Sequence, residues 1–541
     1  MITHTYIMRA RKSVLRLTLM SAVALLSMSC SSFLEEYSQD TDYVRSWEDL
    51  NELLIGSAYQ PVFAADNVST VSDNQYFLHF LSDELDEYPE SYNNSSMAYD
   101  DKERVFGYFT WQARSAQNDT YTGYNADNES KCWTEYYQRI NVANNIIYSA
   151  SQLSSSDETA AQGIRKVDGE ARFLRAYYYF MLVNLYGKAY DPSTAASDLG
   201  VPIKTSAEVE DKKFQRNTVQ ENYDLIVSDL LQAEKDLDGI SQPSRYRADV
   251  TTVRLLLSRV YLYMQNWKQA ADYARKVISA HPALINLNAS TAPAVISESS
   301  PEMIFSMGSN NAMECTANIY KSFTISDKIY KLYAADDLRR SKYMWTNGDF
   351  HGYTKFPINT ASADGYQATD PAYYFQGWYY AWSKQTNEVS DKNFFRSSEA
   401  YLNLAEAEAY LGNDAEARNQ INHLRQYRYA TGSDYTLKSS GEQLIKDIRD
   451  ERERELVMEG QRWFDLRRYA VNTVLPQKTE IVHHYYYYVG RDSNEKTSLH
   501  TFTLTPDDWG WTLNIPQSVL DFNTGMQNNQ RGERSYQTTN L

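Results

Sequence analysis

The sequence predicts a mainly α-helical protein, in which a short superhelix of about four helix pairs stands beside long stretches of irregular structure. Three observations lead to this fold class. Two segments follow a helix-pair repeat pattern, three more carry apolar residues at helical spacing, and the regions between them lack periodic apolar residues. Helix pairs of this kind stack into one continuous core, because each pair buries its apolar face only against a neighbour.

The two repeat-like segments cover 254–282 and 401–424. In the first, the positions that the tetratricopeptide pattern reserves for small, aromatic and closing residues are occupied by Ser258, Tyr261, Trp267, Ala270, Ala274 and Pro282. In the second, Gly412-Asn413-Asp414 predicts a turn, since glycine relieves a helix end and Asn or Asp caps the next helix. Small residues allow helices to approach closely, and apolar rows at i, i+3 and i+4 bury the seam. Both segments are therefore expected to form tetratricopeptide-like helix pairs.

Three further helices are predicted, over 133–148, 168–186 and 219–237. Each carries apolar or aromatic residues three or four positions apart, which places them on one face of a helix. The second helix is expected to stop at Gly187, because glycine is the usual residue just beyond a helix end.

Other regions lack this spacing. Residues 60–130 and 283–395 mix Asn, Asp, Ser and Tyr with few periodic apolar stretches, and 502–529 is mixed, with a short extended piece before Pro516. Loops this long inside a compact protein are usually functional or form irregular structure. We therefore expect a large loop-rich part beside the helices.

The N-terminus has the pattern of a bacterial lipoprotein signal. Four basic residues precede the apolar stretch 17–28, and Ser29 stands before Cys30. A basic region, an apolar region too short to span a bilayer and a small residue at the cleavage point are typical of a secretory signal. We therefore expect residues 1–29 to be removed, Cys30 to become the lipidated first residue and 30–45 to act as a tether. A cleaved, unlipidated secretory protein is the alternative.

Composition narrows the functional classes. The net charge is −17, and removal of four basic residues with the signal takes it to −21. Nucleic-acid binding needs a basic face, so this class is disfavoured. A mean hydropathy of −0.60 argues against a multi-spanning membrane protein. The cysteines other than Cys30, namely Cys132 and Cys315, are too few for a disulfide framework and are expected to be free, buried thiols.

Aromatic residues are abundant, with 45 Tyr and 10 Trp among them. Tyrosine joins an apolar body to a polar tip, so core and interface packing is one explanation. The other is that some of these rings form flat platforms for a sugar or another flat, polar ligand. Both explanations stay open at this point.

Eight motifs follow one another in the chain, at 30–35 (CSSFLE), 169–180 (GEARFLRAYYYF), 184–187 (NLYG), 200–202 (GVP), 405–408 (AEAE), 451–456 (EREREL), 459–468 (EGQRWFDLRR) and 514–516 (NIP). In this order they resemble the motifs of the SusD/RagB family of nutrient-binding outer-membrane lipoproteins. The segment 459–468 is the most family-like, and the resemblance spans Cys30 to about Asn529.

This resemblance implies one SusD-like domain over 46–541, with tetratricopeptide-like helix pairs and an irregular subdomain packed on them. The expected helical repeats lie near 131–150, 165–282 and 398–470, and the ligand-facing irregular parts near 60–130 and 283–395. The resemblance also implies a partner, a TonB-dependent β-barrel transporter of the SusC type in the outer membrane. The lipid-anchored protein would cover this transporter as a lid, facing the exterior and trapping cargo beneath it. Family members bind without catalysis, so neither a cofactor nor a metal is expected.

Some alternatives remain. A surface glycoside hydrolase is one, since two carboxylates can stand anywhere among 70 acidic residues. A purely structural helical-repeat adaptor is another. Within the capture function, the aromatic content favours an oligosaccharide, whereas the net negative charge would suit a basic peptide.

Three segments suggest other chemistry. The glutamates of 451–468 suggest a pair of catalytic carboxylates. However, they alternate with arginines at spacings of i+3 and i+4, which predicts ion-pair ladders in a scaffold. The acidic run 83–87 has ligands for calcium but lacks an ordered loop spacing, so we expect a solvated acidic turn. His483 and His484 are adjacent and face different sides of an extended segment, which argues against a shared metal.

Sugar rings present apolar C–H faces, so the ligand surface is sought where aromatic and polar side chains meet in the irregular regions. The first candidate cluster consists of Tyr108, Trp111, Arg114, Asn118, Tyr121 and Tyr124. The second consists of Trp345, Tyr353, Tyr373, Tyr374, Trp378, Tyr379 and Trp382. For each of these side chains, packing of the irregular subdomain is the alternative.

Overall fold

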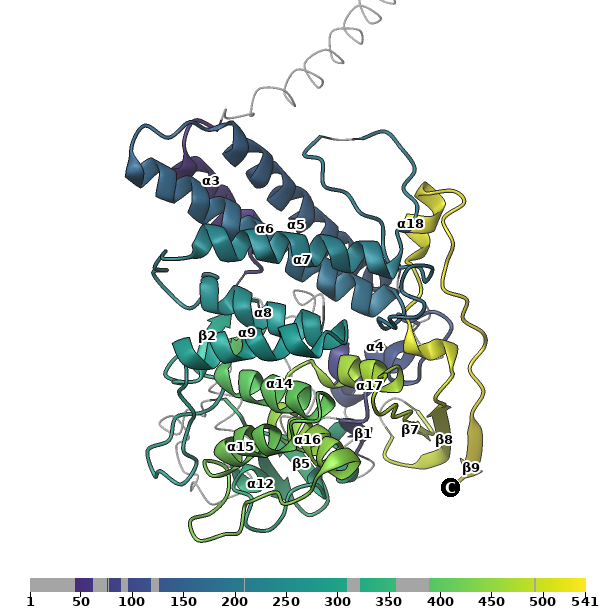
Figure 1. The fold of residues 1–541 in the computed structure, drawn as a ribbon. Coiled ribbons are helices and arrows are strands. Elements are labelled where there is room, and N and C mark those ends of the chain that lie inside the picture. The colour runs from purple at the N-terminus through teal and green to yellow at the C-terminus, as the bar shows by residue number, and fades with distance from the viewer. Residues whose placement is uncertain are drawn as a thin grey trace, which may run out of the picture.

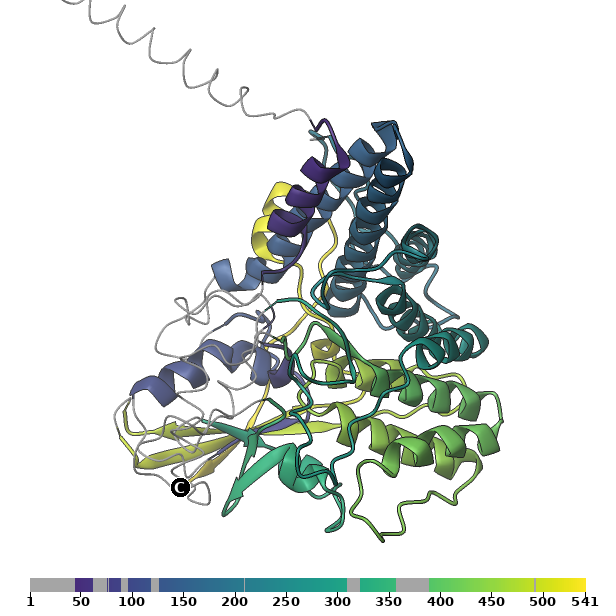
Figure 2. The same cartoon turned by 90° about the vertical axis from the view of Figure 1, so that its left-hand side faces the viewer.

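The computed structural model describes residues 44–61, 75, 77–88, 96–117, 126–208, 210–308, 322–356, 389–490 and 493–541. Within these ranges the fold is mainly helical, as the sequence predicts, and the strands gather below and to one side of the helices (Figures 1 and 2). None of the described helices is long and apolar enough to cross a bilayer.

The superhelix is built from helices that follow each other in the chain and in space (Figure 1). Its first half comprises α5 (Ala126–Gln152), α6 (Glu158–Tyr186), α7 (Val219–Leu237), α8 (Val250–Tyr263) and α9 (Trp267–Ala280). Its second half comprises α14 (Ser397–Tyr410), α15 (Asp414–Arg425), α16 (Gly441–Leu456) and α17 (Arg462–Ala470). Helix α14 packs on α9 although residues 281–396 separate them in sequence. This contact joins the two halves into one superhelix.

Capping residues explain where several helices begin and end. Helix α7 has the predicted bounds, because the hydroxyl of Thr218 accepts a hydrogen bond from the N–H of Glu221 while the Glu221 carboxylate accepts one from the N–H of Thr218. Helix α6 ends beside Gly187 as predicted. Its start at Glu158, capped by Asp157, lies well before the predicted one, because the polar first turns show little apolar periodicity.

Tyrosine has a structural role in α6, which is buried on every side toward its C-terminus. The hydroxyl of Tyr177 donates to the Asn393 side chain at 2.6 Å, and that of Tyr178 donates to the Ala58 carbonyl at 2.6 Å. The neighbouring hydroxyl of Tyr179 donates to the Lys204 carbonyl at 2.9 Å. Each ring fills core volume while its polar tip is satisfied, so packing accounts for these tyrosines.

Small residues bring α8, α9 and α14 together, as the repeat pattern predicts. The hydroxyl of Ser258 on α8 donates to the carbonyl of Ala270 on α9 at 2.9 Å, a contact that requires close approach of the two helices. Arg259 of α8 forms a two-pronged ion pair with Glu399 of α14, with distances of 2.6 and 2.7 Å. Both side chains are buried.

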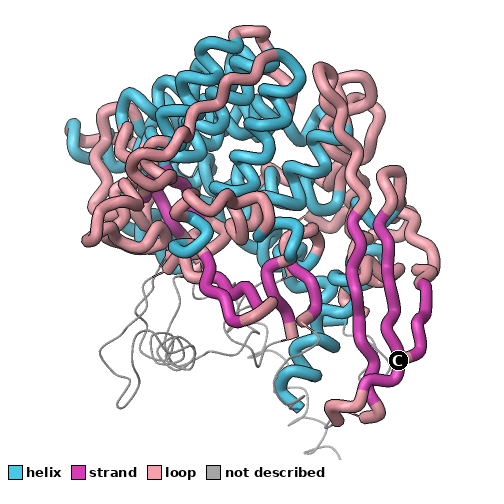
Figure 3. Tube along the Cα trace, turned by 90° about the horizontal axis from the view of Figure 1, so that it is seen from below, coloured by secondary structure: helices cyan, strands magenta, loops and turns pink. Residues whose placement is uncertain are grey.

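The strands form small antiparallel sheets instead of one layer (Figure 3). Three two-stranded pairs are β1 (Leu85–Glu87) with β3 (Phe323–Ile325), β2 (Met303–Ser306) with β6 (Phe394–Arg396), and β4 (Met344–Asn347) with β5 (Phe350–Tyr353). A three-stranded sheet contains β7 (Ile481–Tyr488), β8 (Lys496–Leu504) and β9 (Gln537–Asn540). These sheets make up the irregular subdomain and border the helices.

Two helical elements fall where the sequence analysis predicts little helix. Helix α4 (Ser96–Phe109) lies inside 60–130, and its polar, charged first half explains why apolar periodicity does not reveal it. Helix α3 (Trp47–Leu53) continues into a π-helical turn (Leu54–Ala58) that docks on α5 and α6. Short helices α11 (Asp327–Tyr330), α12 (Arg339–Lys342) and α18 (Gln517–Phe522) complete the described part.

Candidate ligand-binding surface

The small sheets of the irregular subdomain are tied to each other by side-chain hydrogen bonds. Thr324 of β3 accepts from the N–H of His351 of β5 at 2.7 Å. Strand β1 pairs with β3, and its Glu87 accepts from the N–H of Tyr486 of β7 at 2.8 Å. The β4–β5 hairpin is therefore connected, through β3 and β1, to the sheet that follows the helices. Of the two predicted aromatic clusters, Trp345 and Tyr353 lie on this β4–β5 hairpin.

Trp111 is part of a buried aromatic stack. Its indole lies 4.4 Å from the ring of His483, whose other face stacks on Phe109 at 4.0 Å. The indole N–H donates to the Leu81 carbonyl at 3.0 Å, and Trp111 has a left-handed φ of 51°. The residue is fully buried, so it contacts no ligand in this conformation.

Tyr108, like Trp111, is packed inside the protein. Its ring stacks on Phe77 with 4.3 Å between centroids, and it is 2% exposed. For Tyr108 and Trp111, the structure therefore shows the packing role that the sequence analysis kept as the alternative.

Arg114 anchors a turn between helices. Its guanidinium donates to both carboxylate oxygens of Glu129 at 3.0 Å. The same carboxylate accepts from the side chain of Asn514 at 2.7 Å and from the N–H of Gln517 at 3.0 Å. Asn514 belongs to the family-like NIP motif, so Arg114 and this motif meet at one buried acid.

Trp345 is placed differently. It lies on β4, opposite Gly352 of β5, and is partly exposed. A Cβ added at Gly352 would collide with the indole, so the ring rests directly on the backbone of the partner strand. Phe350 supports it at 5.1 Å, whereas Tyr353 at the other end of the hairpin is buried. A flat ring held this way is suited to stacking against a ligand.

The remaining members of the two clusters lie outside the described residues. They are Asn118, Tyr121, Tyr124, Tyr373, Tyr374, Trp378, Tyr379 and Trp382. The same holds for Cys30, the signal segment and most of the tether. Their roles stay predictions.

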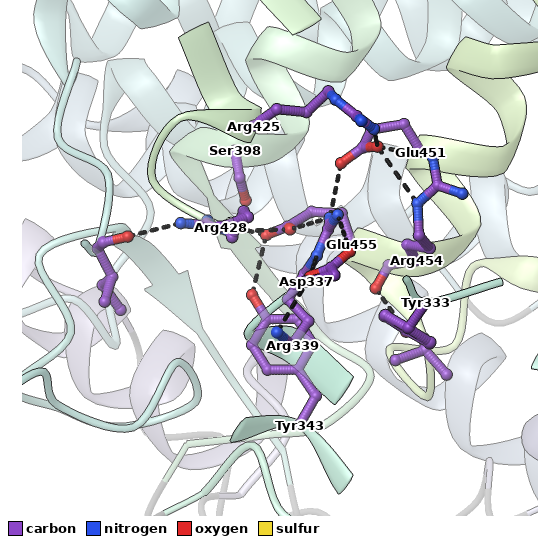
Figure 4. A network of polar contacts seen from close by, with 12 residues as sticks. Tyr333, Asp337, Arg339, Tyr343, Ser398, Arg425, Arg428, Glu451, Arg454 and Glu455 are labelled. Carbon is purple, nitrogen blue, oxygen red and sulfur yellow. Dashed lines mark hydrogen bonds and ion pairs between the residues drawn. The ribbon is translucent and has the colours of Figure 1, made fainter. Parts of the chain in front are cut away.

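The charged run 451–468 forms part of a buried network (Figure 4). Glu455 of α16 accepts from Arg339 at 3.0 Å, from Arg396 at 2.6 Å and from Arg428 at 2.9 Å. Burial by itself would raise the pKa of Glu455, but these three guanidinium groups hold it well below its usual range. A carboxylate clamped in this way is a structural anion.

Glu451, one helical turn away, is surrounded in the same manner by arginines from other segments. It pairs with Arg339 at 2.7 Å and with Arg425 at 2.6 Å, and its pair with Arg454 lies along α16 itself. The prediction of ladders along one helix is therefore only partly right, because most partners come from other elements. The scaffold role is confirmed for these contacts, which join α12, α15, α16 and β6.

The acidic run 83–87 is not a solvated turn, so that prediction is wrong. Asp83 accepts from both prongs of Arg462 at 2.7 and 2.8 Å and also pairs with Lys328, while Glu87 pairs with Lys102 at 2.5 Å. Asp83 and Glu87 are buried. The sequence does not reveal these distant basic partners.

The two adjacent histidines face opposite sides of β7, as the alternation predicts. His483 is buried in the aromatic stack, and its ring nitrogens contact the carbonyls of Phe109 and Ser82 at 2.6 and 2.9 Å. His484 is partly exposed and pairs with Asp86 at 3.2 Å, which raises its pKa. Cys132 is buried, as predicted, and Cys315 lies outside the described residues.

Two family models match this chain. One, described as the SusD family, matches residues 290–532, and the other, described as starch-binding associating with the outer membrane, matches residues 34–262. The chain belongs to the SusD family. Among its relatives are two SusD-like proteins of Formosa agariphila. P25 is 23% identical over 63% of this chain and 70% of its own, and P2 is 26% identical over 63% and 71%.

Solved structures share the fold of this SusD-family chain. A SusD-like carbohydrate binding protein from Bacteroides vulgatus has a TM-score of 0.61 at 19% identity, covering 90% of this chain and 98% of its own. A SusD superfamily protein from Bacteroides fragilis has a TM-score of 0.63 at 21% identity, covering 90% and 100%. The mainly helical fold with tetratricopeptide-like pairs is thus confirmed.

The sequence analysis assigned no role to Trp509 and Trp511 of this SusD-family chain. Both border a cleft of about 570 Å³ at the end of α17, on the helical part of the molecule. The Trp-Gly-Trp sequence was the available signal, but in a chain with 14% aromatic residues it does not stand out.

Proposed function

We propose that this SusD-family protein captures nutrient oligomers, chiefly oligosaccharides, at the bacterial surface and delivers them to a TonB-dependent β-barrel transporter without changing them chemically. Two findings support the proposal. A matching family model is described as starch-binding and associating with the outer membrane, and a protein of the same fold is named a carbohydrate binding protein. The clamped state of Glu451 and Glu455 removes the most conspicuous paired carboxylates from consideration as catalysts.

The observation that carries the site is Trp345, a partly exposed ring held flat on the β4–β5 hairpin. We place the ligand against Trp345, with Trp378, Tyr379 and Trp382 of the second cluster as further platforms and Asn118 and Tyr121 as neighbours. Tyr108 and Trp111 are buried and Arg114 is paired with Glu129, so we assign these three residues a structural role. Stacking of C–H faces on such rings selects sugars by shape.

Calorimetry of the signal-free protein with maltoheptaose, xylohexaose, mannohexaose and a basic peptide tests this function. We expect at least one of the glycans to bind and Trp345→Ala to weaken its binding by about tenfold, with Trp345→Phe close to the parent. Tyr148→Ala, which removes an exposed aromatic ring on α5, serves as the matched control and should leave affinity unchanged. Binding of the peptide alone would redirect the proposal to peptide capture.

Product analysis of the same mixtures addresses catalysis. After prolonged incubation the glycans should be recovered at their original length. Shortened chains in the parent sample would establish a glycoside hydrolase and contradict the proposal.

We also propose that the chain is one SusD-like domain over 46–541, anchored through a lipidated Cys30 and facing the exterior. Mass spectrometry of the mature protein should find an acylated first residue, and Cys30→Ala should release the protein from membranes. Affinity purification from membranes should recover a large β-barrel of the SusC type. Recovery of an unmodified protein without a barrel would instead favour a soluble adaptor or a free binding protein.

A further inference from the structure

A second concave surface lies away from the β4–β5 hairpin. Its walls are the connection after α6 (188–198), the end of α17 (467–471) and the C-terminal segments 506–512 and 529–530. The cleft measures about 570 Å³, within the roughly 300–1,000 Å³ that small-ligand sites occupy. None of these segments contributes to the hairpin that carries Trp345.

Two tryptophans form a rigid part of the wall. Trp511 stacks on the buried Trp463, with 4.8 Å between centroids and 19° between planes, and its N–H donates to the Thr505 carbonyl at 2.9 Å. Trp509 is held by the guanidinium of Arg534, 4.1 Å from its ring centre. Both tryptophans are partly exposed. Rings that are fixed before binding lose little conformational entropy when a ligand stacks on them.

Four of the six charged side chains that line the cleft are held in ion pairs. Lys188 pairs with Asp198 at 2.6 Å, and Asp508 pairs with Arg534 at 2.6 Å. Asp507 pairs with Lys478 at 2.7 Å. A charged ligand would have to compete with these pairs, whereas a neutral ligand leaves them intact.

Arg467, at the base of the cleft, is engaged as well. Its guanidinium donates to the carbonyls of Asn184 and Gly187, which belong to the C-terminal end of α6. It therefore caps that helix end, where a positive charge is favoured. Spare hydrogen-bonding capacity remains on the second carboxylate oxygen of Asp191 and on the amide of Gln530. The side chains of Thr194 and Asn529 are already hydrogen-bonded within the protein.

We propose that this cleft is a second binding site, which takes one end of a neutral, hydroxyl-rich oligosaccharide. The apolar face of a pyranose ring lies against Trp511, and its hydroxyl groups donate to Asp191 and exchange hydrogen bonds with Gln530. The site is separate from the surface around Trp345 and needs no contribution from it. A chain of sugars would then have two points of attachment on one protein.

Two variants test the cleft. Trp511→Ala removes the platform, and Ala470→Phe fills the space from the partly exposed last residue of α17 while leaving the tryptophans in place. Maltoheptaose, xylohexaose and mannohexaose are titrated into the intact signal-free chain, with tetragalacturonate as the charged comparator. We expect one neutral glycan to bind the parent at two sites, and each variant to lose one site or weaken it by at least about tenfold. Tyr148→Ala is the matched control, and the melting temperature of each variant verifies that it folds. If Trp511→Ala does not fold, Ala470→Phe alone tests whether the cleft binds the glycan.

The outcomes separate this proposal from the one for Trp345. Loss of a site in Ala470→Phe but not in Trp345→Ala supports the cleft even if the hairpin binds nothing. Unchanged stoichiometry and affinity in folded cleft variants overturns it, whatever Trp345→Ala does. Tighter binding of tetragalacturonate than of every neutral glycan, or no binding of any probe at millimolar concentration, overturns it too.

Discussion

At the residue scale, the two tryptophans Trp111 and Trp345 have different structural environments and therefore different roles. Trp111 has a left-handed backbone, which is unfavourable for a bulky residue and persists only where the surroundings hold it. Here its N–H is bound by Leu81, its ring by His483 and its carbonyl by Arg534. Trp345 rests on a glycine at the surface of a hairpin. The first is a buried structural element of the subdomain, whereas the second is a partly exposed ring at the surface of a hairpin.

Trp111→Ala is expected to lower the free energy of unfolding by about 3–5 kcal/mol, because it leaves a cavity in the stack and orphans the Leu81 carbonyl. Urea unfolding followed by far-ultraviolet circular dichroism measures the change. Trp345→Ala, at a partly exposed position, should change stability far less. Equal losses in both variants would contradict the division of roles between them.

At the element scale, the ends of a helix were predicted correctly where the sequence contains a complete capping motif. Helix α7 has a capping box at Thr218 and Glu221, and its predicted bounds are confirmed. Helix α6 has a single cap at Asp157 and weakly periodic first turns, so its start was missed. Strand β7 confirms that His483 and His484 face opposite sides, because successive side chains of an extended segment alternate between its two faces.

Thr218→Ala should destabilise the protein by about 1 kcal/mol, because the N–H of Glu221 loses its partner at the start of α7. Thr218→Ser keeps a hydroxyl in place and should recover most of this loss. Thermal unfolding of the three proteins side by side provides the measurement. If alanine and serine behave alike, the cap does not contribute to the stability of α7.

At the scale of the whole molecule, the network around Glu455 joins the helical superhelix to the irregular subdomain. Arg339, Arg396 and Arg428 come from three separate segments and converge on this one carboxylate. Buried ion pairs contribute little relative to apolar packing, but removing one partner leaves the others charged and unpaired. The network therefore specifies how the two parts of the molecule dock.

Glu455→Gln is expected to destabilise the protein by about 3 kcal/mol, since three buried guanidinium groups lose the carboxylate that they share and keep only their other acidic partners. Differential scanning calorimetry measures the loss. Asp434→Asn breaks the exposed pair with Lys438 and serves as the control, with no measurable shift in melting temperature expected. If Glu455→Gln leaves the melting temperature unchanged, solvent or rearranged side chains compensate the charges of these arginines.

Acid should unfold the protein through the same network. The arginines depress the pKa of Glu455 and of Glu451 below the unfolded value of about 4.3, although burial opposes this. Carboxylates of this kind contribute stability above the unfolded pKa, and that contribution is lost as the pH falls through the folded pKa. Urea midpoints at decreasing pH should therefore drop steeply below about pH 4. In Glu455→Gln the drop should be shallower, and an equal slope in both proteins would count against this origin.

The sequence by itself determined the periodic elements of this protein and its membership of the SusD family, because helix spacing, capping residues and short motifs are local properties. Only the tertiary structure decided whether an individual side chain is buried and which residues it pairs with. It buried Trp111 and left Trp345 partly exposed, and it placed Asp83 and Glu87 of the acidic run in buried ion pairs with Arg462 and Lys102. The physical reason is that burial and charge pairing depend on partners from other elements, 15 positions away for Glu87 and 379 for Asp83, which local spacing does not encode.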